Sequence, residues 1–403
     1  MSLSSLSANL PAALRTLPLH IFSKEDMKQK LFIFIKRLMI FVFATTLVLS
    51  TVTFFYIRQD KFGKAPSGER LERMKQSPNF KNGKFQNLSF TPSLTKGYSM
   101  TGVLYNFFFR KHPNRAPIDS IPHIKTDLFK LNKEEDVLIW FGHSSYFMQL
   151  EGKRILVDPV FSGNASPIPG TTRSFIGTEM YTVDDLPAID YLFITHDHYD
   201  HLDYETILKL KTKVSKVICG LGVGSHLEQW GFDTSMIIEK DWHDAFQLDS
   251  NFKVTVTPAR HFSGRSFTRN NTLWCSYILQ TASIKLFIGG DSGYDTHFKS
   301  IFEKYGAVDL AILENGQYNV AWQAIHTLPH EVLQAAKDLH AKRVFPVHSS
   351  KFALANHSWD EPLKKITELN QQLSIPLVTP IIGEPVRLKD TTQTFSQWWT
   401  DIK

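Results

Sequence analysis

Cysteine is scarce in this chain of 403 residues, which contains only Cys219 and Cys275. Two cysteines cannot build the disulfide network on which many small secreted domains depend. Both lie in apolar stretches typical of β-strands, so we expect two buried free thiols, with a single disulfide left as the alternative. The cysteines therefore do not indicate a cellular compartment.

A dense stripe of basic residues is also lacking. The formal net charge of +6 is spread along the whole chain, which shows no internal repeat and no low-complexity tract. Domains that bind nucleic acids usually concentrate positive charge on one face or helix. We therefore expect no nucleic-acid partner, whereas contact with anionic lipid is compatible with this charge. The oligomeric state stays unknown.

Charge is absent from one long segment, residues 38–57, which is long enough to cross a bilayer. A cleaved signal peptide is the alternative, because a basic start precedes the apolar run. No clear small-residue cleavage motif follows, so we expect an uncleaved single-pass membrane anchor. A small excess of lysine and arginine on its N-terminal side favours an extracytoplasmic location for the following domain.

Three further parts are expected around this anchor. Residues 1–37 form a short polar and mixed segment without an evident fold. Residues 58–135 are expected to form a linker and an N-terminal extension packed on the domain, because residues 58–99 are rich in Gly, Pro, Ser, Lys and Asn. Within them, "VLYNFFFRKHP" predicts either an interfacial contact beside a membrane or a strand or short helix that covers the core. Residues 136–403 would form the main domain.

The main domain begins with short apolar runs separated by turns, of which "VLIWFG", "YFMQLEG" and "RILVDPV" predict three consecutive strands. Further along the chain, strands alternate with helical periods at residues 204–213, 296–305, 329–339 and 359–371. Two sheets with helices on their outer faces would satisfy this pattern, which makes the fold class α/β.

Metal-binding residue types crowd into the loop after the predicted strand "YLFIT", where they are His196, His198, Asp200 and His201. Residues two apart in an extended chain point to the same side, so the first two histidines can face one point. The aspartate and the third histidine can turn toward a second point. Imidazole and carboxylate together suit zinc or a similar first-row divalent metal.

One loop cannot complete two metal sites, so other strand ends must contribute. "VTVTPAR" leads to His261, "LFIGG" to Asp291 and "RVFPV" to His348. Each alone would be a weak signal. Together with the loop they complete two sets of three protein ligands that share a carboxylate.

At this point the chain resembles the metallo-β-lactamase superfamily, since "THDHYDH" matches its H-x-H-x-D-H signature and the similarity covers residues 136–388. The resemblance implies a four-layer αββα sandwich, here preceded by one N-terminal transmembrane helix. It also implies one metal held by His196, His198 and His261, another held by Asp200, His201 and His348, and a bridging Asp291.

A narrower resemblance is to the branch that contains N-acyl-phosphatidylethanolamine-hydrolysing phospholipase D. It rests on "LVDPVFSGNASP", "HDHYDHLDY", "GDSGY" and "VHSSKFALANH", and it brings Asp158 and His326 into the site. We expect Asp158 to hydrogen-bond a ligand imidazole. We expect His326 to bind a substrate oxyanion or to protonate the leaving group. "LENGQYN" places Glu314 and Asn315 where that branch is apolar, and the membrane anchor also differs, so the substrate stays open.

Three more residues complete the predicted surroundings of the metals. His143 follows a strand and is expected beside the ligands. Tyr318 and Trp322 are expected to line a substrate pocket, with Glu314 near the metal end of its strand.

Two divalent ions, zinc in the first place with manganese or iron as alternatives, would lower the pKa of a shared water from about 15.7 to about 7. Asp200 or Asp291 would orient the resulting hydroxide. We therefore expect a membrane-anchored hydrolase, specifically a phosphodiesterase of phospholipase D type that acts on N-acyl-phosphatidylethanolamine-like lipids. A lactonase or another carbonyl-ester hydrolase is the alternative. A non-catalytic metal-binding protein is the third, and it would predict a missing ligand, whereas none is missing.

Overall fold

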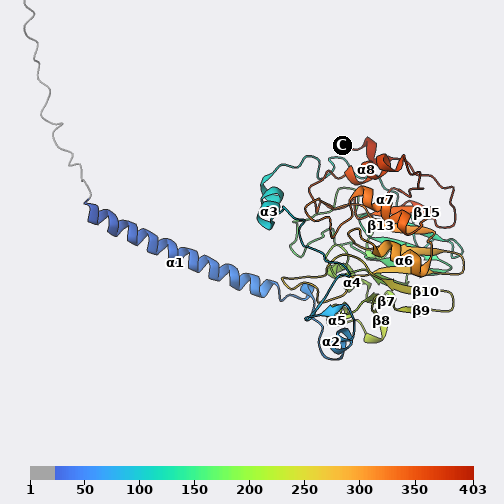
Figure 1. Cartoon of the computed structure of the whole chain (residues 1–403), viewed down its shortest axis with the longest axis horizontal. Coiled ribbons are helices and arrows are strands. Elements are labelled where there is room, and N and C mark those ends of the chain that lie inside the picture. The colour runs from blue at the N-terminus through green and yellow to red at the C-terminus, as the bar shows by residue number, and fades with distance from the viewer. Residues whose placement is uncertain (1–22) are drawn as a thin grey trace, which may run out of the picture. The chain divides into compact units, whose positions relative to one another are not determined.

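The first part of the computed structural model is a single long helix. The structure describes residues 23–403, and these fall into two compact units divided between Gln59 and Asp60. In the first unit, α1 (Lys24–Tyr56) has 33 residues, none of them buried, and is long and apolar enough to cross a membrane (Figure 1). Its length of about 50 Å exceeds the hydrocarbon core of a bilayer, about 30 Å.

This helix begins earlier than the predicted apolar span of residues 38–57. Ser23 caps it by accepting a hydrogen bond from the backbone N–H of Asp26 at 3.1 Å. Lysine, glutamate, glutamine and methionine then propagate the helix into the apolar run, since all four are good helix formers. Part of the predicted N-terminal segment, residues 1–22, lies outside the described residues.

The second unit contains two mixed β-sheets and a small β-hairpin. The hairpin is β1 (Phe80–Lys81) with β2 (Lys84–Phe85). The seven-stranded sheet has the order β15 (Pro385–Arg387), β3 (Val137–Trp140), β4 (Tyr146–Leu150), β5 (Lys153–Val157), β6 (Ile189–Ile194), β7 (Val214–Gly220) and β8 (Ile237–Lys240). The six-stranded sheet has the order β14 (Val344–Val347), β13 (Leu310–Glu314), β12 (Lys285–Ile288), β11 (Ser276–Gln280), β10 (Lys253–Thr257) and β9 (Ala245–Gln247). The strands from β5 to β8 are parallel, as are those from β12 to β14.

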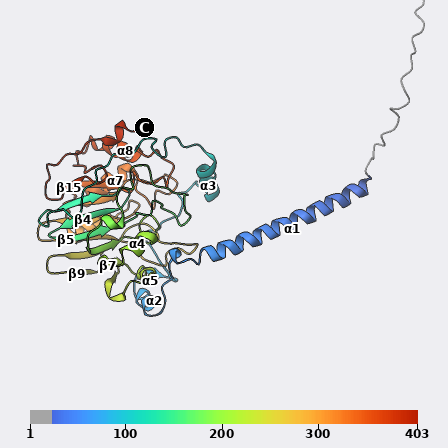
Figure 2. The ribbon, with the colours of Figure 1, turned by 180° about the vertical axis from the view of Figure 1, so that it is seen from behind.

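Alternation along the strands divides the core into three apolar layers. In β6, Tyr191 and Phe193 face the other sheet, while Leu192 and Ile194 face the opposite side. On that outer side they pack with α4 (Tyr204–Leu210) and α5 (Gly224–Gln229). The outer side of the six-stranded sheet packs with α6 (His297–Tyr305), α7 (Pro329–Asp338) and α8 (Glu361–Asn370), as Figures 1 and 2 show. The predicted αββα sandwich is therefore confirmed.

Local patterns in the sequence predicted most of these strands and helices. The turn between β4 and β5 consists of Glu151 and Gly152, both with positive φ (46° and 76°), which is the conformation of a tight two-residue hairpin. Four predicted helices match α4, α6, α7 and α8. Cys219 and Cys275 are buried free thiols, as predicted. The short edge strands β8, β9 and β15 escaped prediction because three or four residues carry too little periodicity.

The stretch before the main domain contains α2 (Gly68–Lys75) and α3 (Met100–Phe109). A buried ion pair fixes α2, because Arg70 Nε donates to Glu239 Oε2 at 2.8 Å and only 2% of the Glu239 side chain is exposed. Arg70 also donates to Glu228 at 2.7 Å. The other carboxylate oxygen of Glu239 accepts from the backbone N–H of Gly222 at 2.8 Å. Residues far apart in the sequence are thus tied together by one buried carboxylate.

Replacing Glu239 with alanine should lower the free energy of unfolding by about 2–4 kcal/mol, because it leaves buried donors without an acceptor. Urea unfolding of the detergent-purified chain measures this change. Glu72→Ala is the matched control, since the Glu72–Lys75 pair is exposed and its loss should cost less than about 1 kcal/mol. Equal losses in the two variants would show that the buried carboxylate does not stabilise this region.

Candidate metal centre

The predicted metal-binding residues come together at one edge of the two sheets. His196, Asp200 and His201 follow β6, while Asp291 follows β12 and His348 follows β14. Strand β6 is parallel to both of its neighbours, and β12 and β14 are both parallel to β13, so within each sheet these carboxyl ends meet at one edge. The sandwich thereby collects side chains that are far apart in the sequence.

Three histidines form the first set. Nε2 of His196 lies 2.9 Å from Nδ1 of His198, and Nε2 of His261 lies 3.2 Å from the same atom. The three nitrogens can hold one ion between them. This set contains the three residues assigned to one metal from the resemblance.

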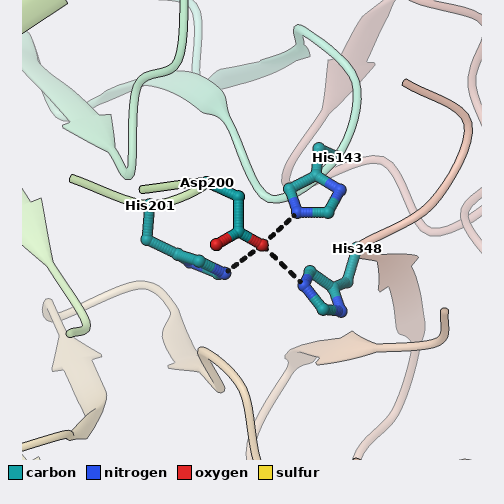
Figure 3. Close-up of side chains that lie close together, drawn as sticks. All are labelled: His143, Asp200, His201 and His348. Atoms are coloured by element: carbon teal, nitrogen blue, oxygen red, sulfur yellow. Dashed lines mark hydrogen bonds and ion pairs between the residues drawn. The ribbon is translucent and has the colours of Figure 1, made fainter. Parts of the chain in front are cut away.

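A second set surrounds one carboxylate oxygen. Oδ2 of Asp200 lies 3.0 Å from Nε2 of His143, 3.4 Å from Nε2 of His348 and 3.6 Å from Nε2 of His201. Figure 3 shows the three imidazoles converging on this oxygen from different segments. His143, predicted only to lie nearby, is therefore in direct contact with a predicted ligand.

Asp291 lies between the two sets. Its carboxylate oxygens are 3.2 Å from Nε2 of His201 and 3.1 Å from Nε2 of His348, both in the second set. They are also 4.0 Å from Nε2 of His196 and 3.9 Å from Nε2 of His261, both in the first set. With 3% of its surface exposed, Asp291 has the position that a bridging carboxylate requires.

The backbone at this edge is strained at three predicted site residues. His143, Asp158 and His348 have positive φ angles of 53°, 40° and 67°. Non-glycine residues in this region are uncommon and cost free energy, so the surrounding structure must hold them there. Backbone hydrogen bonds from His143 to Ser349 (3.0 Å) and from His348 to His143 (3.0 Å) hold two of them, and one from Asp158 to Phe193 (3.1 Å) holds the third.

Asp158 is hydrogen-bonded to His201. Its Oδ2 accepts a hydrogen bond from Nδ1 of His201 at 2.8 Å, and its Oδ1 accepts from the backbone N–H of Thr195 at 2.9 Å. Nε2 of His201 is consequently the nitrogen that faces Asp200 and Asp291. Buried carboxylates often fix metal-binding histidines in this manner.

The donor groups fit divalent metal ions. Among the described residues, Nε2 of His201 and Oδ1 of Asp291 are buried polar atoms that lie 3.2 Å apart without the geometry of a hydrogen bond, which is costly unless another group satisfies them. Burial lowers the pKa of His198 to about 4 and keeps the pKa of His196 and His261 well below the usual value, so these rings are neutral and able to bind a metal.

The carboxylates at the centre are ionised. Burial alone would raise the pKa of Asp200 and Asp291, but neighbouring imidazoles, above all His201, hold both values well below the usual range. The pKa of His201 is raised, because these two carboxylates outweigh its burial. The centre therefore favours positive charge, which a metal ion supplies.

His326 lies beside this centre and is paired with Glu314. Nδ1 of His326 is 2.8 Å from Oε2 of Glu314, and the backbone N–H of Thr327 donates to Oε1 of Glu314 at 2.8 Å. Oε2 of Glu314 is also 3.5 Å from Nδ1 of His348. Asn315 points elsewhere, since its side chain donates to the carbonyl of Pro362 at 2.9 Å.

A family model for the β-lactamase superfamily domain matches residues 153–349, which include all seven predicted ligands. An uncharacterized protein of Mycobacterium tuberculosis is 33% identical over 330 residues, covering 80% of this chain and 88% of that protein. The chain belongs to the metallo-β-lactamase superfamily. This membership bears out the predicted metal-dependent hydrolase.

Two further similarities accompany this membership. The mitochondrial N-acyl-phosphatidylethanolamine-hydrolyzing phospholipase D of Saccharomyces cerevisiae is 35% identical over 241 residues, or 57% of this chain and 51% of the yeast enzyme. The solved structure of a metallo hydrolase from Ignicoccus hospitalis matches with a TM-score of 0.48 and 21% identity, covering 62% of this chain and 97% of that one.

In this protein, a cavity of about 300 Å³ opens over the candidate metal centre. Asp200, Asp291, His326 and His348 line it, and so does Trp322. Tyr318 does not line it, because its hydroxyl donates to Glu361 at 3.1 Å and its ring stacks on His357.

Other cavity residues escaped the sequence prediction. They include Phe262, Arg269 and Gln317 in the main domain, and Met100 and Val103 of α3. Arg269 follows the His261 loop closely, and its guanidinium lies 4.6 Å from the centre of the Phe262 ring. Among these residues, only Arg269 could have been predicted from the sequence, since it lies close to the loop that carries His261. Nothing local in the sequence indicates that α3 contacts this cavity.

Proposed function

We propose that this protein is a membrane-anchored phosphodiesterase of phospholipase D type that acts on N-acyl-phosphatidylethanolamine-like lipids. The observation that carries the proposal is the convergence of both ligand sets on Asp291 beneath a cavity lined by apolar residues and Arg269. The similarity to the yeast phospholipase D supports it, as does α1, whose composition suits a bilayer. The seven predicted ligands and a pair of ions, with zinc favoured, belong to this proposal.

When bound, the metal ions would supply a water of lowered pKa and positive charge for the phosphoryl oxygens. The protein groups have separate tasks. Asp200 and Asp291 orient the attacking water, and Arg269 binds the phosphate, for which a guanidinium is well suited. His326 faces the cavity and gives a proton to the leaving oxygen.

The reaction balances as a simple hydrolysis. The oxygen of water forms a bond to phosphorus, and the bond between phosphorus and the ethanolamine oxygen breaks. That oxygen takes the proton from His326, and the ring regains a proton from the attacking water. The products are phosphatidic acid and an N-acylethanolamine.

The test is to incubate the detergent-purified protein with N-acyl-phosphatidylethanolamine, phosphatidylethanolamine and phosphatidylcholine. We expect release of phosphatidic acid from the N-acylated lipid, its loss with a chelator and its return when zinc is added. Mass spectrometry of the lipid extract measures the product. Absence of phosphatidic acid under every metal condition would rule out the lipid reaction.

A lactonase is the second candidate, because the cavity of about 300 Å³ lies at the lower end of ligand-pocket volumes and would enclose a small lactone. The same centre can polarise a carbonyl group. A panel of lactones, assayed with and without chelator, separates the two functions. Metal-dependent ring opening without lipid hydrolysis would favour the lactonase.

A further inference from the structure

Helix α3 has apolar residues on every side. Its sequence, MTGVLYNFFF, contains no charge, and Val103 and Phe107 are partly buried. Its side chains Leu104, Tyr105 and Phe109, which do not line the cavity, are between 47% and 75% exposed. A helix that is apolar all round is normally buried in a large core or in a membrane. We therefore expect the exposed apolar face of α3 to contact another apolar surface.

This exposed face adjoins the cavity over the metal centre. Met100 and Val103 of α3 line the cavity, while Leu104, Tyr105 and Phe109 extend the apolar surface away from it. The rings of Tyr105 and Phe109 stack with centres 5.4 Å apart. Figures 1 and 2 both place α3 at the periphery of the second unit, apart from the two sheets. A surface that contacts the exposed face of α3 would therefore lie next to the cavity over the candidate metal centre.

We propose that the outer face of α3 inserts into the surface of an anionic lipid bilayer and that lipid substrates enter the cavity from there. This inference rests on the proposed function and specifies how its substrate arrives. Exposed basic residues flank the helix at Lys96, Arg110 and Lys111, where they can meet lipid phosphates. Tyr98, 47% exposed, adds an aromatic ring of the kind enriched at membrane interfaces.

The size of the cavity favours a bilayer over a second copy of the chain. About 300 Å³ can enclose a phosphodiester headgroup but not the acyl chains of a phospholipid as well. The chains must therefore remain outside, in contact with an apolar phase. A bilayer against α3 provides that phase and leaves the entrance open. A second protein copy seated on α3 would cover the same entrance.

The experiment uses the full chain in lipid nanodiscs that contain phosphatidylglycerol. Leu104→Cys carries an environment-sensitive fluorophore, which is selective because both native cysteines are buried. Lys299→Cys on α6 is the control, since this lysine side chain is 69% exposed and Figure 1 shows α6 on the side of the unit away from α3. We expect spin-labelled lipids to quench the fluorophore at residue 104 at least about threefold more than at residue 299. Equal quenching would overturn the proposal.

Two further outcomes are informative. Energy transfer between fluorophores at residue 104 on two copies, without quenching by lipid, would identify a second copy as the cover and also overturn the proposal. Quenching at residue 104 without hydrolysis of any phospholipid would support membrane docking while contradicting the proposed lipid activity. The failure of one statement is thus distinguishable from the failure of the other.

Rates of hydrolysis by variants of the exposed α3 face test membrane docking independently of the fluorescence experiment. The double variant Leu104→Ser, Phe109→Ser should hydrolyse nanodisc lipid at least about tenfold more slowly while keeping its rate on the water-soluble diester bis(p-nitrophenyl) phosphate. Neither residue lines the cavity. Leu369→Ser, which changes an exposed leucine on α8, should alter neither rate. A parallel loss on both substrates would show that the double variant damages the fold rather than docking.

Discussion

Replacing Asp291 with asparagine is expected to lower kcat by about 10³-fold or more and to reduce the bound metal. A factor of 10³ corresponds to about 4 kcal/mol of transition-state stabilisation. The reason is the position of this carboxylate, which contacts members of both ligand sets and is 3% exposed. An amide has the same shape but lacks the negative charge with which Asp291 would hold the two proposed cations. Elemental analysis and steady-state kinetics on a soluble phosphodiester measure the two effects.

Asp295→Asn is the matched control for this variant. Asp295 belongs to the same segment, but it lies 3.6 Å from Arg260 and is not among the groups that could hold a metal. We expect its kcat and metal content to stay within about twofold of the parent protein. An Asp291→Asn protein that keeps full metal content and full activity would show that the carboxylate does not bridge the two sets.

Removal of the metal should also lower thermal stability. A ligand that binds only the folded state adds about 4 kcal/mol when its concentration is a thousand times its Kd. Chelation should therefore lower the melting temperature of the parent protein clearly, and that of Asp291→Asn much less. Identical shifts in the two proteins would place the stabilising metal at another site.

The main site was predictable from the sequence because its physical cause is simple. Each of His261, Asp291 and His348 follows a run of residues that forms a strand. These strands, β10, β12 and β14, run in the same direction within one sheet, so the residues after them reach the same edge. The loop from His196 to His201 supplied the remaining groups. Prediction of the αββα layers succeeded for a similar reason, since strand alternation and helical periodicity are encoded locally.

The rest of the site depends on tertiary contacts that leave no local trace. Met100 precedes the main domain, yet it lines the cavity over the centre. Tyr318 is close to Trp322 in the sequence, but its hydroxyl donates to Glu361, a residue from α8 that is far from it in the chain. The partner of Glu314 could not be read from the sequence either, since His326 is brought back to it only by the loop before α7.

A second large effect on kcat is expected from substitutions of His326 and its partner Glu314. His326→Gln should lower kcat by about 10²–10⁴-fold, the usual contribution of a positioned acid or base, with KM changed by less than about threefold. Glu314→Gln should lower kcat by about 10–100-fold, because the carboxylate fixes the orientation of the ring through Nδ1. Glu314→Asp should recover part of the lost rate. Kinetics on N-acyl-phosphatidylethanolamine in detergent micelles, whose alkoxide leaving group needs a proton, give all three values.

The double variant distinguishes positioning from an independent role. If Glu314 acts through His326, the variant that lacks both side chains should be no slower than His326→Gln alone. Multiplied losses would contradict this dependence. Glu314 also lies 3.5 Å from Nδ1 of His348, so it has a second path to the centre. Metal content separates the two paths: an unchanged content in Glu314→Gln assigns the lost rate to His326, whereas a reduced content assigns it to His348 and the metal.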